Sequence, residues 1–256
     1  MTEIAQYIAV LDGAGDRLAR AAATAGLDAR VPTCPGWAVR DLVAHVGGVH
    51  RWATSYVVTG RAGPTTGDEE AAFFRRPPDS ELLSWYAEGH ASLVATLGGA
   101  DPAMSCWAFL PAPSPLAFWA RRQAHETAVH CADAEASAGL PTTFPGDFAA
   151  DGIDELLNGF LARPGGRLVA DPPVVVAVRA ADTGDCWTVR IEPDRRVVSP
   201  GASEADCTLA GRASDLYLLL WNRLLWNRLA PRPVIDVSGD ARVLDLWRAS
   251  ATVRWA

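Results

Sequence analysis

The order of apolar and polar residues predicts that the first part of the chain is helical. Apolar residues recur three or four positions apart, the period of a helix with one buried face. Four such segments cover approximately residues 4–22, 37–60, 80–97 and 114–139. The connections at 61–78 and 98–113 are rich in glycine, proline and polar residues, so they are predicted as loops. Four long amphipathic helices with lengthy connections indicate an antiparallel bundle.

After a shorter predicted helix at 148–162, the cluster Arg163-Pro-Gly-Gly marks a boundary and the period changes. Short β-branched or alternating runs then predict strands at 174–178, 187–191, 197–198, 207–210 and 234–237. Two further helices are expected, one over 214–229 and one that begins at Gly239-Asp240. The sequence therefore predicts an α+β protein of two domains, a helical bundle over 1–163 and a small α/β layer over 164–256.

Composition narrows the function classes. The 256 residues include 30 acidic and 23 basic residues, a net charge of −7, and every basic residue is arginine. Without lysine, no Schiff-base, pyridoxal or Walker-type phosphate lysine is available. The acidic balance argues against nucleic-acid binding. No run reaches the roughly 18 apolar residues of a membrane span, and the N-terminus lacks a signal layout, so we expect an intracellular, cytoplasmic protein.

Cysteine usage adds a second exclusion. The five cysteines are scattered and form no CxxC pair, so neither a disulfide framework nor a thiolate zinc knuckle is indicated.

Four of the five histidines stand in two pairs, and their spacing suggests a metal site. Glu126 and His130 are four apart in the fourth predicted helix, so both project from one face, about 6 Å apart along the axis. A carboxylate and an imidazole at this spacing can chelate one ion. On the second predicted helix, His45 and His50 are five apart, so at most one follows the buried face of Leu42. We assign that position to His45.

Together these residues would form a set of two histidines and one carboxylate. Such a set leaves a coordination position for water or substrate, which is typical of catalytic metal sites. The alternative is that Glu126 and His130 form a solvated surface pair, which is common at this spacing.

Two blocks carry a more specific signal, Cys34-Pro-Gly-Trp37-x-Val-Arg-Asp-Leu-Val-Ala-His45 and Glu126-x-x-x-His130-x-x-Asp133-x-Glu135. Together they resemble the mycothiol-dependent maleylpyruvate isomerase family. The segment from Leu218 to Arg223 and Gly239-Asp240 also fit its second half, so the resemblance spans essentially the whole chain. It implies a DinB-like four-helix bundle with a divalent metal, usually zinc, and a smaller C-terminal α/β domain distantly similar to sterol-carrier folds.

The resemblance also implies a function. His45, Glu126 and His130 would be the metal ligands, and mycothiol would be the thiol cosubstrate, deprotonated at the metal to attack an electrophilic small molecule. The outcome would be cis–trans isomerisation or S-transfer, and a mycothiol S-transferase or an enzyme of natural-product metabolism is the runner-up. A non-catalytic protein that binds a metal or small molecule is the alternative outside enzymes. The lack of lysine hints at GC-rich coding, as in actinobacteria, where mycothiol is made.

The resemblance places a substrate-facing arginine at Arg223. Here the sequence departs from the family pattern, because Leu-Trp-Asn-Arg-Leu occurs twice in succession. On a continuous helix, Arg223 and Arg228 would point about 140° apart. Either could bind a substrate carboxylate, or both could be solvent-exposed.

Other candidates rank lower. Asp133 could orient a ligand imidazole or lie at the surface. His50 and His125 could support a ligand or be exposed, and packing or surface roles are expected for Cys34, Trp37 and His90.

Overall fold

The computed structural model describes residues 2–201, 203–224 and 235–251 and divides the chain into two compact units, Met1–Thr142 and Thr143–Ala256. The two-domain α+β organisation expected from the sequence is confirmed. The division falls before α6 (Gly146–Asp154), whereas the sequence analysis placed this helix in the first domain. The reason is that α6 packs on α7 (Ala213–Leu220), which belongs to the second unit.

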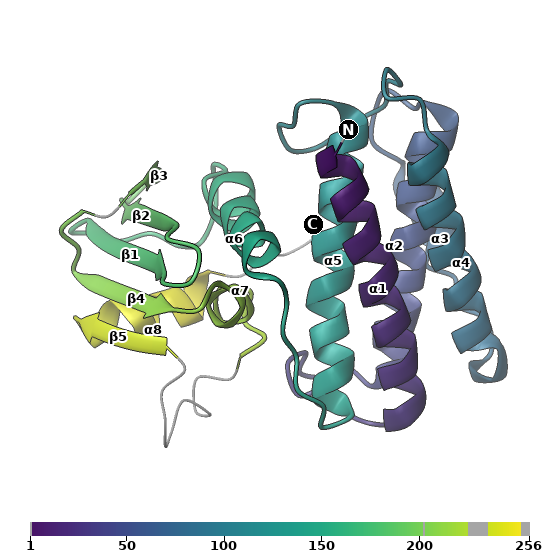
Figure 1. Ribbon diagram of the computed structural model, residues 1–256, viewed down its shortest axis with the longest axis horizontal. Coiled ribbons are helices and arrows are strands. Elements are labelled where there is room, and N and C mark those ends of the chain that lie inside the picture. The colour runs from purple at the N-terminus through teal and green to yellow at the C-terminus, as the bar shows by residue number, and fades with distance from the viewer. Residues whose placement is uncertain (1, 202, 225–234, 252–256) are drawn as a thin grey trace. The chain divides into compact units, whose positions relative to one another are not determined.

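Four long helices form the first unit and lie side by side as a bundle (Figure 1). They are α1 (Thr2–Ala25), α2 (Val39–Thr59), α4 (Asp79–Gly99) and α5 (Pro115–Ser137). α1 and α2 each pack on both α4 and α5. Their apolar stripes fill the core, as the 3.6-residue period predicts. None of the described helices is both long and apolar enough to cross a membrane.

Helix α5 is the exception to the one-sided pattern. Nearly every residue from Leu116 to Glu135 is buried, including most of the charged ones. A helix buried on all sides needs partners for its polar side chains, because an unpaired polar group away from water is costly. The candidate site lies on this helix.

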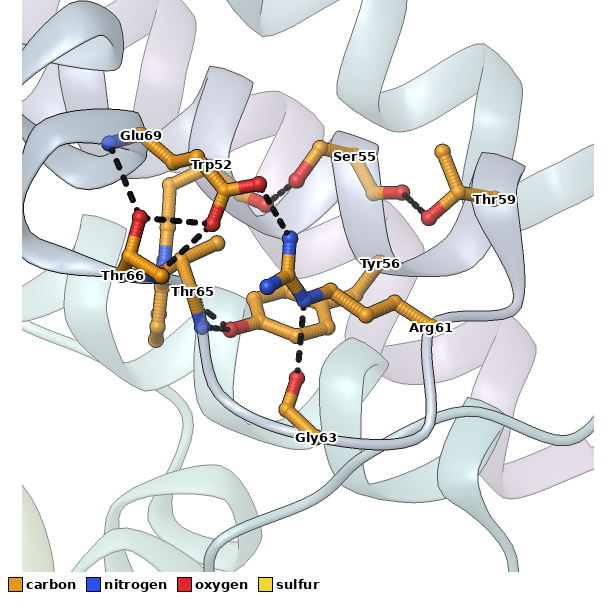
Figure 2. Close-up of polar contacts among 9 residues, drawn as sticks. All are labelled: Trp52, Ser55, Tyr56, Thr59, Arg61, Gly63, Thr65, Thr66 and Glu69. Atoms are coloured by element: carbon orange, nitrogen blue, oxygen red, sulfur yellow. Dashed lines mark hydrogen bonds and ion pairs between the residues drawn. The ribbon is translucent and has the colours of Figure 1, made fainter.

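A short helix, α3 (Gly67–Phe73), occupies part of the segment 61–78, so the prediction of an unbroken loop there was wrong. The helix buries none of its residues, so its sequence shows no apolar stripe that would have revealed it. Its first turn is fixed instead by a reciprocal cap between Thr66 and Glu69. Figure 2 shows this cap beside the end of α2, where the Tyr56 hydroxyl accepts a 2.7 Å hydrogen bond from the backbone N–H of Thr65.

The second unit contains a five-stranded sheet in the order β3-β2-β1-β4-β5. The strands are β1 (Val174–Ala180), β2 (Cys186–Ile191), β3 (Arg196–Pro200), β4 (Cys207–Gly211) and β5 (Ile235–Gly239). β1 and β4 are parallel and the other neighbours antiparallel. Helix α7 packs on β1 and β4, and α8 (Ala241–Ser250) packs on β4. The period-two runs found in the sequence are the strands of this mixed sheet.

Two helices of this unit differ from the sequence prediction. The segment Glu155–Leu161 is a π-helix that continues α6, not part of a single α-helix. Helix α7 ends at Leu220, because Asn222 adopts a left-handed conformation (φ 61°) that stops helical hydrogen bonding. The expected extension to Leu229, with Arg228, falls in 225–234, outside the described residues.

Candidate metal centre

Three side chains from two helices of the bundle converge on one point. His45 comes from α2, and Glu126 and His130 from α5. Nε2 of His45 lies 3.4 Å from Oε1 of Glu126, and Nε2 of His130 lies 3.3 Å from the same oxygen. One ligand atom from each residue lies within 4.8 Å of the other two, close enough for all three to hold a single ion. The set that the sequence analysis selected is thus brought together.

Asp133 determines which nitrogen of His130 faces this point. Nδ1 of His130 lies 2.8 Å from Oδ2 of Asp133, which is fully buried. An ionised carboxylate only accepts hydrogen bonds, so Nδ1 carries the proton. In the neutral ring Nε2 then presents its lone pair to the carboxylate oxygen of Glu126. Two electron-rich atoms at 3.3 Å repel each other unless a cation or a proton lies between them, so the donor set fits a metal ion.

The charges around Glu126 keep it ionised. Burial opposes ionisation, but hydrogen bonds from His130 and His45 and the charges of His130 and Arg122 outweigh it, so the pKa of Glu126 lies well below its ordinary value. Nη2 of Arg122 donates to Oε2 of Glu126 at 2.8 Å, one turn earlier on α5. Oε1 is left facing the two imidazoles. Burial lowers the pKa of His130, but Asp133 and Glu126 raise it overall, so a bound metal would replace a proton here.

The turn before α2 supports this arrangement from the other side. Thr33 Oγ1 donates to Oδ1 of Asp133 at 2.5 Å, and Sγ of Cys34 donates to Oδ2 at 3.4 Å. The atoms of Cys34, His130 and Asp133 also lie close enough to hold an ion. Since they already satisfy one another by hydrogen bonds, we interpret this group as the support that orients His130.

Comparison with known proteins assigns the chain to a family. Residues 9–135 match the mycothiol maleylpyruvate isomerase N-terminal domain, and residues 147–246 match the C-terminal domain of the same family. The chain belongs to the mycothiol-dependent maleylpyruvate isomerase family. No curated protein matches it significantly in sequence.

Two solved structures show the same fold. A crystal structure of the mycothiol-dependent maleylpyruvate isomerase aligns with a TM-score of 0.58 at 14% identity, covering 92% of each chain. A histidine-to-alanine mutant of that enzyme aligns with a TM-score of 0.59 at 14% identity, over 86% of this chain and 90% of the other. Family membership thus rests on the two domain matches, and the structures show a shared fold.

Within this family fold, the other histidines are all placed inside the bundle. The sequence analysis expected at most one of His45 and His50 to follow the buried face of α2. The structure brings His45 to the candidate centre, and it also buries His50 fully. Nε2 of His50 lies 2.9 Å from Oγ1 of Thr127. Burial lowers the pKa of His50 well below its ordinary value. His90 and His125 are buried as well, not exposed.

The expected substrate arginine of the family's second domain is not on a helix. Arg223 follows the end of α7, and its Nη1 donates to the backbone oxygen of Trp221 at 2.8 Å. Arg223 therefore lies beyond the helix end, and the separation of about 140° expected on a continuous helix does not apply to it.

Three residues at the centre were not predicted from the sequence: Arg122, Thr33 and Phe74, whose ring centroid lies 6.0 Å from that of His45. Arg122 could have been found, because it precedes Glu126 by four positions in the same helix. Thr33 and Phe74 are distant in sequence and carry no local signal.

Proposed function

We propose that this protein is a metal-dependent enzyme that activates mycothiol for attack on a small electrophilic substrate. The observation that carries the proposal is the convergence of His45, Glu126 and His130, with the His130 proton fixed at Nδ1 by Asp133. The family match supports mycothiol as the thiol.

His45, Glu126 and His130 would hold the ion, and we propose zinc, since nitrogen and carboxylate oxygen donors in a set of three suit it. Three protein ligands leave a coordination position open, as in catalytic sites. A divalent cation bound there would lower the pKa of a coordinated thiol and so supply a thiolate at neutral pH.

The neighbouring side chains would preserve the ligand set. Asp133 keeps the His130 proton on Nδ1, which leaves Nε2 free to ligate. Arg122 holds Glu126 through Oε2, so that Oε1 stays directed at the ion. The ring of Trp37 stacks on His130 at 6.2 Å and lies 5.1 Å from His45, so it would help to keep both imidazoles in place.

The reaction would begin when the thiolate sulfur bonds to an activated carbon of the substrate. For isomerisation, sulfur would add to a conjugated double bond, and the electron pair of that bond would move onto the conjugated carbonyl oxygen. The resulting single bond would rotate, and the pair would return to form the trans double bond as sulfur leaves with the electrons of the carbon–sulfur bond. For transfer, the carbon–sulfur bond would stay, and the substrate carbanion would take up a proton from solvent. We propose that Arg223 binds a substrate carboxylate, the role that a forked guanidinium fits.

The test is to incubate the purified, zinc-loaded protein with mycothiol and maleylpyruvate and to follow the products by proton NMR. The proposal expects the trans product or a stable S-conjugate from the wild type. His130→Gln should lose bound zinc and at least 100-fold in rate.

His90→Gln is the matched control, since His90 is another buried histidine of the bundle, on α4. It should keep the zinc and most of the activity. Full activity of a zinc-free His130→Gln protein would overturn the proposal.

A further inference from the structure

The candidate metal centre opens at one ligand. The side chain of His45 is 22% exposed, whereas those of Glu126 and His130 are 5% and 8% exposed. A molecule that reaches the three donor atoms therefore approaches from the His45 side. The residues that contact His45 there decide which molecules fit.

Two aromatic rings lie at this opening. The ring centroid of Trp37 lies 5.1 Å from that of His45, and the centroid of Phe74 lies 6.0 Å from it. Both rings are only half-buried, although each is a large apolar group. They come from different segments, Trp37 from the turn before α2 and Phe74 from the end of α3.

The backbone provides a seat for the Phe74 ring. A side chain at Gly48 would place its Cβ only 2.5 Å from a ring atom of Phe74, so the ring fills space that a glycine leaves open. Gly48 stands three residues after His45, on the same face of α2. The ring is thus held beside the metal ligand by packing against bare helix backbone.

Polar contacts hold the start of helix α3. It buries no residue of its own and begins at the Thr66–Glu69 cap, where Arg61 also binds Glu69 at 2.8 Å (Figure 2). The contacts of Arg61, Thr66 and Glu69 in Figure 2 fix the start of the helix, and Phe74 follows its end. Replacing Phe74 should therefore alter the opening while leaving the bundle core unchanged.

The chemistry of the opening favours a flat substrate. Aromatic faces attract planar conjugated groups by stacking. The guanidinium at the centre, that of Arg122, is already bound to Glu126. We propose that Trp37 and Phe74 are specificity-determining residues that hold a planar, conjugated electrophile against the metal centre. The reaction rests on the proposed function, whereas the binding of a planar molecule by these two rings does not.

The kinetic test compares two electrophiles with mycothiol as the thiol. With 1-chloro-2,4-dinitrobenzene, sulfur bonds to the ring carbon and chloride leaves; with iodoacetamide, sulfur bonds to the methylene carbon and iodide leaves. Phe74→Leu removes the ring but keeps an apolar side chain. We expect kcat/KM for the dinitro compound to fall about two- to twelvefold, the range for one aromatic contact. The rate with iodoacetamide and the zinc affinity should stay within twofold.

Phe73→Leu is the matched control, because Phe73 is the preceding residue and is also half-buried. It should leave both rates unchanged. Equal losses on both electrophiles in Phe74→Leu, or no loss with the dinitro compound, would overturn the inference.

A binding measurement separates this inference from the proposed function. Calorimetric titration with 1,3-dinitrobenzene, which is planar but unreactive, should show binding to the purified wild type and weaker binding to Phe74→Leu. If this difference is found but no thiol reaction occurs, the proposed function fails and the inference stands. If the wild type does not bind the compound, or the variant binds it equally well, the inference fails.

Discussion

Replacing Asp133 by asparagine tests the support of the metal centre most sharply. The buried carboxylate accepts hydrogen bonds from Thr33 Oγ1, Cys34 Sγ and His130 Nδ1. Asparagine has nearly the same shape but only one accepting oxygen, so it cannot satisfy all three donors. If that oxygen faces His130, the bond to the imidazole survives but loses its charge-assisted part, about half its strength.

The expected loss of zinc affinity follows from the position of Asp133 behind the ligand His130. Losing a carboxylate behind a ligand histidine typically weakens metal binding 10- to 100-fold. This corresponds to about 1.4 to 2.8 kcal/mol. Since the shape is retained, the free energy of unfolding of the metal-free Asp133→Asn protein should fall by no more than about 1 to 3 kcal/mol, the cost of one imperfectly paired buried group.

Zinc affinity can be measured by competition with a chromogenic chelator, and stability by urea unfolding of the metal-free protein. Ser137→Ala is a close control, because the Ser137 hydroxyl donates to the backbone oxygen of Asp133 at 2.9 Å and does not touch its carboxylate. Zinc binding by Asp133→Asn as tight as that of the wild type, or an equal loss in Ser137→Ala, would show that the Asp133 carboxylate does not support the ligand.

Three further predictions follow from the first unit. Burial lowers the folded-state pKa values of His50 and His90, so the unfolded chain takes up protons first as the pH falls. The free energy of unfolding should therefore decrease below about pH 6.5, by up to about 1.4 kcal/mol per pH unit for each histidine. Urea unfolding from pH 7.5 to 5 should show a smaller decrease for His50→Gln, and an unchanged decrease would contradict this prediction. Burial raises the pKa of Cys131 to about 12, so iodoacetamide at pH 8 should leave this cysteine unmodified in the native protein. Half-buried Cys186 should react under the same conditions, and mass spectrometry would show the difference. Early labelling of Cys131 would argue against its burial. Thr66→Ala removes the cap of α3 and should increase proteolytic cleavage within residues 61–78. The free energy of global unfolding should fall by less than about 1 kcal/mol. Cleavage of the variant at the same rate as the wild type would show that the cap is dispensable.

The sequence predicted those parts of the fold that depend on local periodicity. Apolar residues on one face specified the four long helices, and alternation specified the sheet. Helix α3 was missed because it buries no residue, although the Thr66–Glu69 cap was a readable signal. The π-helix at Glu155–Leu161 and the early end of α7 depend on packing and on Asn222, which periodicity does not reveal.

The candidate site likewise contains residues that the sequence predicted and residues that only the folded structure brings together. Glu126 and His130 are four apart on one helix, so their proximity follows from helix geometry alone. His45 was assigned to the site from the face of Leu42 and the family resemblance, yet the structure buries His50 more deeply. The contacts of Thr33 with Asp133 and of Phe74 with His45 join residues far apart in the sequence, so only the folded structure reveals them.

X-ray absorption at the zinc edge would identify the atoms that bind the ion. On the zinc-loaded wild type, we expect nitrogen and oxygen ligands at about 2.0 to 2.2 Å with an imidazole signature from two histidines. Adding mycothiol should introduce one sulfur ligand at about 2.3 Å, and His130→Gln should lose the zinc. A zinc shell that contains protein sulfur before mycothiol is added, or one that stays unchanged afterwards, would contradict the account.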